Sequence, residues 1–178
     1  MSQKSINTIK EFSHLRVAVE EIFNNISNHS TEEIGCCFAQ FYPRTNQIKI
    51  SFSDFGIGIP TSLRNTWDTI NHNNKIGEEV ETLSDSDLLE IAVREGVSSK
   101  SKPGNRGAGL WNIIRSLTSD GIGTVHIKSN YGRIWYKNKE VKYKEESKSC
   151  YPGTFFDIIL YTDNKSLFDD EIEEEFEW

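Results

Sequence analysis

Four short motifs lie on or at the ends of predicted helices and strands, in an order that leaves few folds open to this chain. The first, Glu-x-x-x-Asn at residues 21–25, is on a predicted helix, and the second, residues 54–60, closes a predicted strand. The third, residues 105–110, opens another helix, and the fourth, Gly-Thr-Phe at 153–155, enters the last strand. Each motif alone is weak evidence, but the ordered set predicts one particular arrangement of helices and strands around a nucleotide pocket.

Helix and strand signals alternate around these motifs. Apolar residues at helical spacing predict helices over about 11–28 and 109–117, and residues 84–87 offer caps for a helix over 88–94. Alternating apolar and polar residues predict strands at 34–42, 47–53, 123–128, 133–136, 141–143 and 154–161, with turns at 43–46, 130–132 and 137–139. The polar stretch 71–86 is expected to be a mobile loop that ends in a helix cap. The sum predicts an α+β fold, a two-layer α/β sandwich with helices on one face of a mixed, mainly antiparallel sheet.

Length and charge bound the organisation and the partners. A chain of 178 residues with 36% hydrophobic content fits a single domain, placed at 1–168, followed by an acidic tail at 169–178. The tail holds seven acidic residues and no Lys or Arg, so the other residues carry 20 acidic and 20 basic side chains. A neutral body argues against nucleic acid as a partner. The tail is expected to be a solvated end, with a docking peptide for a basic partner as the alternative.

Location and cysteine use follow from the same composition. No signal peptide and no apolar run of membrane-spanning length is recognised, which predicts a cytoplasmic protein that does not bind membranes. Cys36, Cys37 and Cys150 show no Cys-x-x-Cys spacing. We expect reduced thiols packed as small hydrophobic side chains.

The first motif combines a carboxylate with amides on one side of a helix. Glu21 and Asn25 are one turn apart and away from the apolar stripe, with Asn28 and His29 one turn further on. An Asn carboxamide offers Mg²⁺ a neutral oxygen, and a nearby Glu can take a proton from an attacking water or hydroxyl group. The alternative is an ordinary solvated helix face.

The second motif aims an acidic residue into the interior. In the strand that ends at Asp54, the alternation puts this residue on the same side as Ile48, Ile50 and Phe52. A buried carboxylate needs hydrogen-bond donors, which an adenine amino group and an ordered water would supply. Gly56 and Gly58 lack Cβ and would let the backbone approach a flat ring. The alternative is a turn capped by the Asp side chain.

The third motif offers backbone N–H groups to an anion. Gly107-Ala108-Gly109 at a helix start exposes these groups and the positive end of the helix dipole. Arg106 and other basic residues precede it, so residues of about 94–107 are expected to form a basic lid over a triphosphate. A glycine-rich linker is the alternative for this segment, and a strand-entry turn is the alternative for Gly153 and Thr154.

Several other classes of site are excluded by missing residues. The Asp-Phe-Gly triplet at 54–56 has no accompanying His-Arg-Asp or Val-Ala-Ile-Lys motif, so it does not indicate a protein-kinase fold. No Walker A motif and no His-Glu-x-x-His motif occurs.

The ordered set resembles the GHKL superfamily, the Bergerat-fold ATPases that include histidine kinases, anti-sigma-factor serine kinases, type II topoisomerases, MutL and a heat-shock chaperone. The resemblance covers about residues 11–162, with 19–30 as the N box, 54–60 as the G1 box, 106–110 as the G2 box and 153–154 as the late Gly-Thr element. It implies a Bergerat fold that binds Mg·ATP, with Asn25 on the metal and Glu21 as the catalytic base. The residues implied to bind the nucleotide are Asn25, Asn28, His29, Asp54, Gly56, Gly58, Ile59, Arg106, Gly107, Ala108, Gly109, Leu110 and Thr154.

Within this superfamily, residues 15–21 with little chain before them resemble the stand-alone anti-sigma-factor kinases. Asn28 departs from the basic residue that histidine kinases often have, and the segment 132–152 is longer than expected. The first hypothesis is an enzyme that transfers the γ-phosphate of ATP to a Ser or His of a protein partner in signalling. The alternatives are an ATP-driven switch or slow ATPase that controls a protein interface, and a non-catalytic docking scaffold. The oligomeric state stays open, with a homodimer as one alternative.

Overall fold

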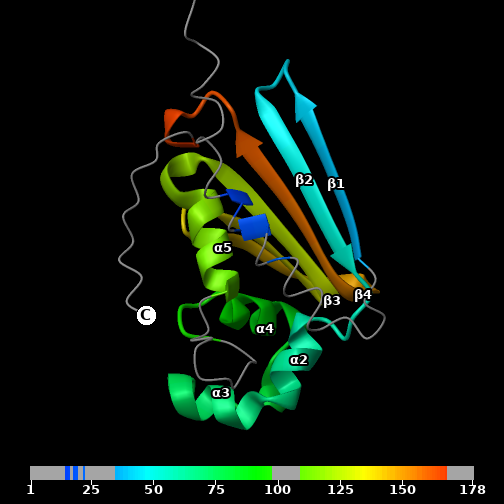
Figure 1. Cartoon of the computed structure of the whole chain (residues 1–178). Helices are drawn as coiled ribbons and strands as arrows, with labels where there is room; N and C mark the ends of the chain where they lie inside the picture. Colours follow the sequence, from blue (N-terminus) through cyan, green and yellow to red (C-terminus); the bar gives the residue numbers. More distant parts are fainter. Residues whose placement is uncertain (1–14, 17, 20–21, 23–34, 98–108, 168–178) are drawn as a thin grey trace, which may run out of the picture.

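The structure is a computed structural model that describes residues 15–16, 18–19, 22, 35–97 and 109–167. A four-stranded sheet forms one layer and the helices pack on one of its faces (Figure 1). The strand order is β1-β2-β4-β3, and every described pairing is antiparallel. The elements are β1 (Gly35–Tyr42), β2 (Gln47–Asp54), α2 (Ile59–Asn65), α3 (Trp67–Asn74), η2 (Val80–Thr82), α4 (Asp85–Ala92), α5 (Gly109–Thr118), η3 (Ser119–Gly121), β3 (Gly123–Lys137), β4 (Glu140–Tyr161) and η4 (Lys165–Leu167). The α+β, two-layer fold class is therefore confirmed.

The first hairpin follows the sequence pattern closely. β1 pairs with β2 from Gly35 opposite Asp54 to Tyr42 opposite Gln47, and Asn46 in the turn has a φ of 50°. In β2 the side chains of Ile50, Phe52 and Asp54 are buried while the residues between them are partly exposed. The alternation of the sequence therefore predicted which face of this strand meets the core.

The core lies between the sheet and the helices. Its main cluster joins α5 to the inner faces of β2, β3 and β4, and Ala18 and Ile22 are fully buried in it. The described positions 15, 16, 18, 19 and 22 are helical, and the remainder of the first predicted helix lies outside the described residues. A second cluster joins α2, α3 and α4 below the main one (Figure 1). The two clusters fix α4 and α5 relative to the strand ends.

The start of α4 carries the caps that the sequence predicted. Ser84 Oγ accepts a hydrogen bond from the backbone N–H of Asp87, and the Asp87 carboxylate accepts one from the backbone N–H of Ser84. This reciprocal capping box satisfies two N–H groups that the helix itself leaves without partners.

One loop prediction was wrong. The stretch 71–86 was expected to be a mobile loop, but residues 71–74 end α3, residues 80–82 form η2 and residues 85–86 open α4. The sequence analysis also missed α2 and the first part of α3. Their buried residues, Leu63, Trp67 and Ile70, are four and three positions apart, which is helical spacing, so the sequence carried a signal that the analysis overlooked. In the structure they are buried by packing with α4.

The course of β3 also differs from the prediction. A turn was expected at residues 130–132, but β3 continues through them, with register shifts against β4 at Ser129, Asn130 and Gly132. The shorter strands predicted at 133–136 and 141–143 are thus the distal parts of β3 and β4, joined by the predicted turn at 137–139. Bulges of this kind bend a strand without ending it.

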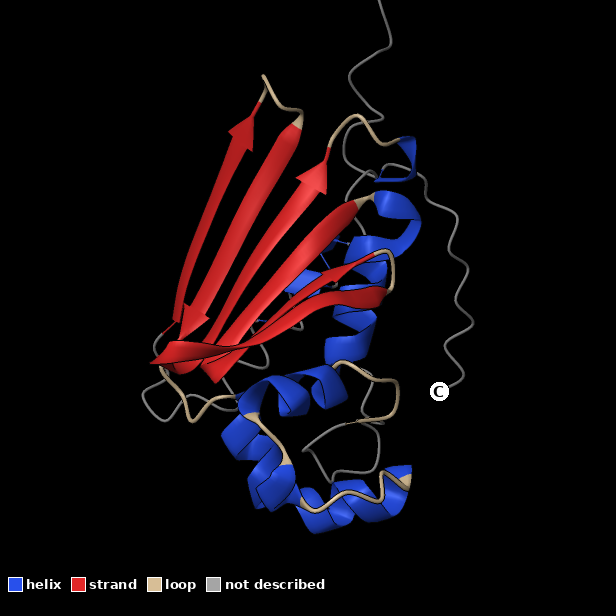
Figure 2. Cartoon of the chain, turned by 180° about the vertical axis from the view of Figure 1, so that it is seen from behind, coloured by secondary structure: helices blue, strands red, loops and turns tan. Residues whose placement is uncertain are grey.

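The bend turns the distal hairpin back toward the helices (Figure 2). A Cβ at Gly132 would lie 2.6 Å from the backbone carbon of Asp85, so this bend packs directly on the start of α4. Lys144 Nζ lies 2.7 Å from Asp87 Oδ1 and 2.5 Å from Glu90 Oε2, and Glu146 Oε1 accepts a hydrogen bond from the backbone N–H of Ser86. The long segment 132–152 therefore braces α4.

The cysteines are free thiols as predicted, but the prediction that they are packed in the interior was wrong. Cys36, Cys37 and Cys150 are all free and exposed, the first two on β1 and the third on β4. Their surroundings depend on which strand forms the sheet edge, and the local sequence does not encode this.

Candidate functional site

Asp54 is the buried acidic residue at the end of β2. Asp54 is 7% exposed, and its Oδ1 accepts hydrogen bonds from the backbone N–H of Gly56 at 2.8 Å and of Thr154 at 3.2 Å. The prediction that this carboxylate points inward is confirmed. The first of these bonds is also the capped turn that the sequence left open as an alternative. Two donors for the carboxylate therefore come from the protein's own backbone.

Gly153 allows β4 to approach Asp54. Its φ is 91°, and a Cβ at this position would lie 2.3 Å from the backbone oxygen of Asp54 and 2.6 Å from its Oδ1. A side chain would therefore collide with the acid and strain the backbone. The Gly-Thr pair of the fourth motif thus lies directly against the second motif, as the ordered set implied.

Ser129 in β3 connects these two segments. Ser129 is fully buried. Its Oγ accepts a hydrogen bond from the backbone N–H of Ile59 at 2.9 Å and donates one to the carbonyl of Gly153 at 2.7 Å. The Thr154 hydroxyl lies 3.2 Å from the same oxygen. A single hydroxyl group thus ties β4 to the turn that follows Asp54.

Asn130 holds the other side of this turn. Its Nδ2 donates to Thr61 Oγ1 at 3.1 Å, and a Cβ at Gly58 would lie 1.8 Å from its Oδ1. Gly58 also has a φ of 80°, so both its backbone conformation and its neighbour require glycine. The sequence analysis missed Ser129 and Asn130, because it assigned them to the end of a strand and a turn, where polar residues are common.

The second and third motifs each contribute one apolar residue to the same two core clusters. Ile59, at the start of α2, and Leu110, at the start of α5, are partly buried and pack against both core clusters. The end of β2 and the start of α5 lie at the same end of the sheet (Figure 1). Gly109 opens α5 as predicted. The structure therefore brings together parts of the second, third and fourth motifs.

The remaining predicted site residues lie outside the described part of the chain: Glu21, Asn25, Asn28, His29, Arg106, Gly107 and Ala108. Most of the predicted lid, residues 98–107, lies outside it too. Their roles stay predictions.

Comparisons with known proteins give only distant similarity. No protein-family model matches the chain, and no curated protein matches it in sequence. The topoisomerase IV ATP-binding domain of Francisella tularensis, solved with a small-molecule inhibitor, is similar in structure with a TM-score of 0.46 and 17% identity, covering 90% of this chain and 69% of that one. The 43K ATPase domain of Thermus thermophilus gyrase B, in complex with an aminocoumarin, has a TM-score of 0.45 and 14% identity, covering 88% of this chain. The present chain spans 35% of that gyrase B structure.

Two further properties bear on what the described residues can bind. Among them, no group of three or more His, Cys, Asp or Glu side chains is placed to hold a metal ion. In the same part of the chain, no helix is long and apolar enough to cross a membrane.

Proposed function

We propose that the chain binds ATP in the manner of a GHKL domain, with the adenine amino group on the Asp54 carboxylate. One observation carries the proposal: Asp54, Thr154 and the glycine turn of the second motif are locked together at the end of the sheet where α5 begins. Parts of three motifs that are far apart in the sequence thus lie at the same end of the sheet, which supports a single shared site. Helix starts and glycine turns at such a position favour an anionic, flat ligand.

The chemistry of the Asp54 surroundings fits a purine. An ionised carboxylate can accept about four hydrogen bonds, and the two backbone N–H groups on Oδ1 fix its orientation. Phe55 and Ile57 in the following turn are 49% and 39% exposed, so the turn after the buried acid presents apolar side chains to solvent. A flat apolar ring with one polar edge is recognised by this combination of an apolar surface and few fixed polar groups.

We further propose the roles of the residues that lie outside the described part. The N–H groups of residues 107–110 would hold phosphate oxygens, and Asn25 would hold Mg²⁺ through its carboxamide oxygen. Bound Mg²⁺ would neutralise charge on the phosphates during transfer. Glu21 would accept the proton of the attacking hydroxyl group or imidazole.

For the reaction itself, we propose transfer of the γ-phosphate to a Ser or His of a protein partner, in a cytoplasmic signalling role like that of the anti-sigma-factor kinases. The neutral body of the chain, with 20 acidic and 20 basic residues outside the tail, favours a protein over a nucleic acid as the partner.

Calorimetric titration with Mg·ATP tests the binding step. Asp54→Asn should weaken ATP binding by at least about tenfold, because a hydrogen bond to a charged group is worth about 1.5–3 kcal/mol. Asp163→Asn, the same change at an exposed position, should leave the affinity unchanged. Equal affinities of the folded Asp54→Asn variant and the wild type would refute the adenine assignment.

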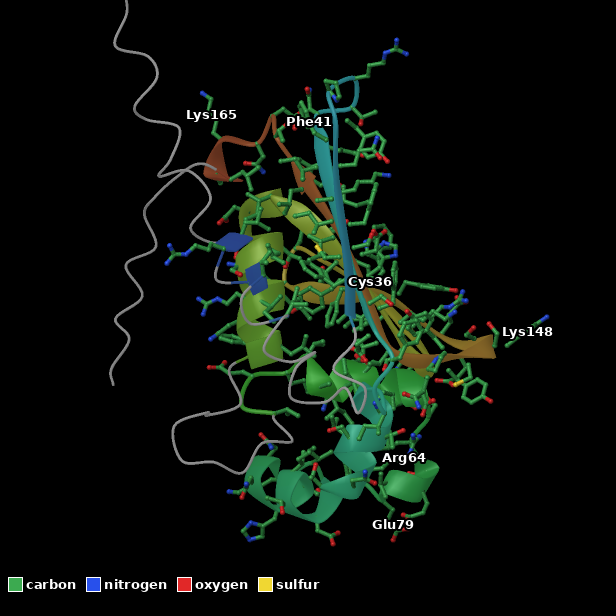
Figure 3. All side chains as sticks on the ribbon, turned by 45° about the vertical axis from the view of Figure 1, so that its right-hand side comes forward. Cys36, Phe41, Arg64, Glu79, Lys148 and Lys165 are labelled. Atoms are coloured by element: carbon green, nitrogen blue, oxygen red, sulfur yellow. The ribbon has the colours of Figure 1, made fainter. Side chains whose placement is uncertain are left out.

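A second experiment tests the transfer step. Radiolabelled γ-phosphate should reach a co-purified protein, and Glu21→Gln should abolish the labelling without weakening ATP binding. Glu79→Gln, at an exposed site that Figure 3 labels, should label the partner normally. If ATP changes the affinity for the partner and no label is transferred, the chain is a nucleotide-driven switch and the transfer proposal is wrong.

A further inference from the structure

β1 is the edge strand of the sheet, and all eight of its residues are exposed. Its backbone pairs with β2 on one side, and no described strand pairs with its other side. An edge strand presents alternate N–H and C=O groups that can pair with another strand. We propose that β1 pairs antiparallel with β1 of a second copy of this chain, about a twofold axis, to form one continuous sheet of two copies.

The first argument is that β1 has none of the features that prevent edge pairing. Natural edge strands are usually blunted by charged residues, proline, bulges or short length. β1, with the sequence Gly-Cys-Cys-Phe-Ala-Gln-Phe-Tyr, has no charged residue and no proline. Its pairing with β2 runs through all eight residues without a register shift, so no bulge bends the strand away. The backbone of another strand can therefore pair with this edge.

The second argument is that β1 exposes apolar side chains on both faces of the sheet. Phe38 is opposite Ser51, on the outer face, and is 61% exposed. Phe41 is opposite Ile48, on the face that carries the helices, and is 55% exposed. Figure 3 shows Phe41 and Cys36 along this outermost strand. Docking on one face would cover only one of the two phenylalanines, whereas a strand added at the edge lies beside both.

The third argument concerns charge, and it favours a second copy as the occupant. Because β1 is neutral, two copies of it can be paired without placing like charges opposite each other. The nearest following charge is Arg44 in the turn after β1. Antiparallel pairing keeps the two Arg44 side chains beyond opposite ends of the paired strands, which are about 27 Å long for eight residues, whereas parallel pairing would bring them together.

The test is the mass of the protein in solution, measured by light scattering during size-exclusion chromatography from micromolar to millimolar concentration. The wild type should approach twice the chain mass of 20.4 kDa. Ala39→Lys places a charge at the middle of β1, where the two copies would meet, and should halve the measured mass. Ser149→Lys, at an exposed position of β4, is the matched control and should stay dimeric.

Two outcomes overturn the proposal. In the first, the wild type stays at the mass of one chain, and β1 would then be free to pair with a strand of another protein. In the second, the wild type is a dimer that Ala39→Lys does not weaken. Circular dichroism establishes that the variant is folded. If Ala39→Lys is not folded, hydrogen exchange of the wild type at low and high protein concentration tests the interface instead. The β1 amides should exchange more slowly at the higher concentration, and unchanged exchange refutes the interface. None of these results depends on ATP binding.

Discussion

Asp54 and Thr154 are one hundred residues apart in the chain, and the backbone N–H of Thr154 donates a hydrogen bond to Asp54 Oδ1 at 3.2 Å. This bond joins the end of β2 to residue 154 of β4. Because the same oxygen also accepts the N–H of Gly56, the carboxylate orients both the turn and the neighbouring strand. The residue we propose to recognise adenine is therefore also a structural tie.

Gly58→Ala should destabilise the fold more than an ordinary glycine substitution. The new Cβ would lie 1.8 Å from Asn130 Oδ1, and the backbone φ of 80° disfavours a side chain. We expect the free energy of unfolding to fall by about 2–4 kcal/mol, from backbone strain and overpacking together. Urea denaturation measures the loss. Gly77→Ala is a matched control, because Gly77 has a φ of 75° but a Cβ added there would meet no atom within 4 Å. Equal losses for the two variants would mean that contact with Asn130 is unimportant.

Ser129→Ala should loosen the turn after Asp54. The change removes the acceptor of the Ile59 N–H and the donor to the Gly153 carbonyl in a fully buried place. We expect a loss of about 1–3 kcal/mol in the free energy of unfolding, the cost of leaving buried polar groups without partners. The amide resonance of Ile59 should shift in the NMR spectrum. Ser116→Ala, which removes a hydroxyl group bonded to a carbonyl within α5, should cost much less. An unmoved Ile59 resonance would contradict the assigned hydrogen bond.

Asp87 should make the stability depend on acid pH. Hydrogen bonds from Lys144 and then Ser84 lower the pKa of Asp87 from 3.8 to about 2. A carboxyl group whose pKa is lower in the folded state stabilises the fold above its unfolded pKa, and this contribution is lost as the pH falls from about 4 to 2. Because the side chain is 33% exposed, we expect about 1 kcal/mol or less.

Urea denaturation of Asp87→Asn between pH 2 and pH 6 measures this contribution. The difference in unfolding free energy between wild type and variant should shrink as the pH falls through that window. The side-chain oxygen of Asn can still accept the backbone N–H of Ser84, so the comparison isolates the charge. A difference that does not change with pH would show that the bond to Lys144 adds nothing to stability.

Arg64→Ala should lower the free energy of unfolding, because it removes the partner of a buried acid. Arg64 Nη1 lies 2.5 Å from Asp85 Oδ1, and Asp85 is 7% exposed and also accepts the backbone N–H of Tyr131. Without the guanidinium group, the carboxylate keeps its burial but loses its cationic partner. We expect about 1.5–3 kcal/mol of destabilisation in thermal or urea unfolding. Adding Asp85→Asn to Arg64→Ala should recover part of the loss. A double variant that is as unstable as the sum of both single changes would contradict this pairing.

Local sequence patterns predicted the elements whose signals act over a few residues. The alternation in β2 gave the inward direction of Asp54, Ser84 and Asp87 gave the start of α4, and the apolar stripe gave α5. These signals depend on side-chain period and on hydrogen bonds between residues three or four apart. The analysis missed α2 and α3, although Leu63, Trp67 and Ile70 have the same helical spacing and form a buried face against α4.

The sequence by itself determined the α+β class, the first hairpin and the order of the motifs. Only the tertiary structure decided that β3 runs through residues 130–132, that Ser129 and Asn130 hold the turn after Asp54, and that β1 is an exposed edge. The physical reason is distance along the chain. The hydrogen bond between Ile59 and Ser129 joins residues 70 positions apart, and that between Asp54 and Thr154 joins residues 100 positions apart. Such contacts depend on how the whole core packs, so no local period or cap encodes them.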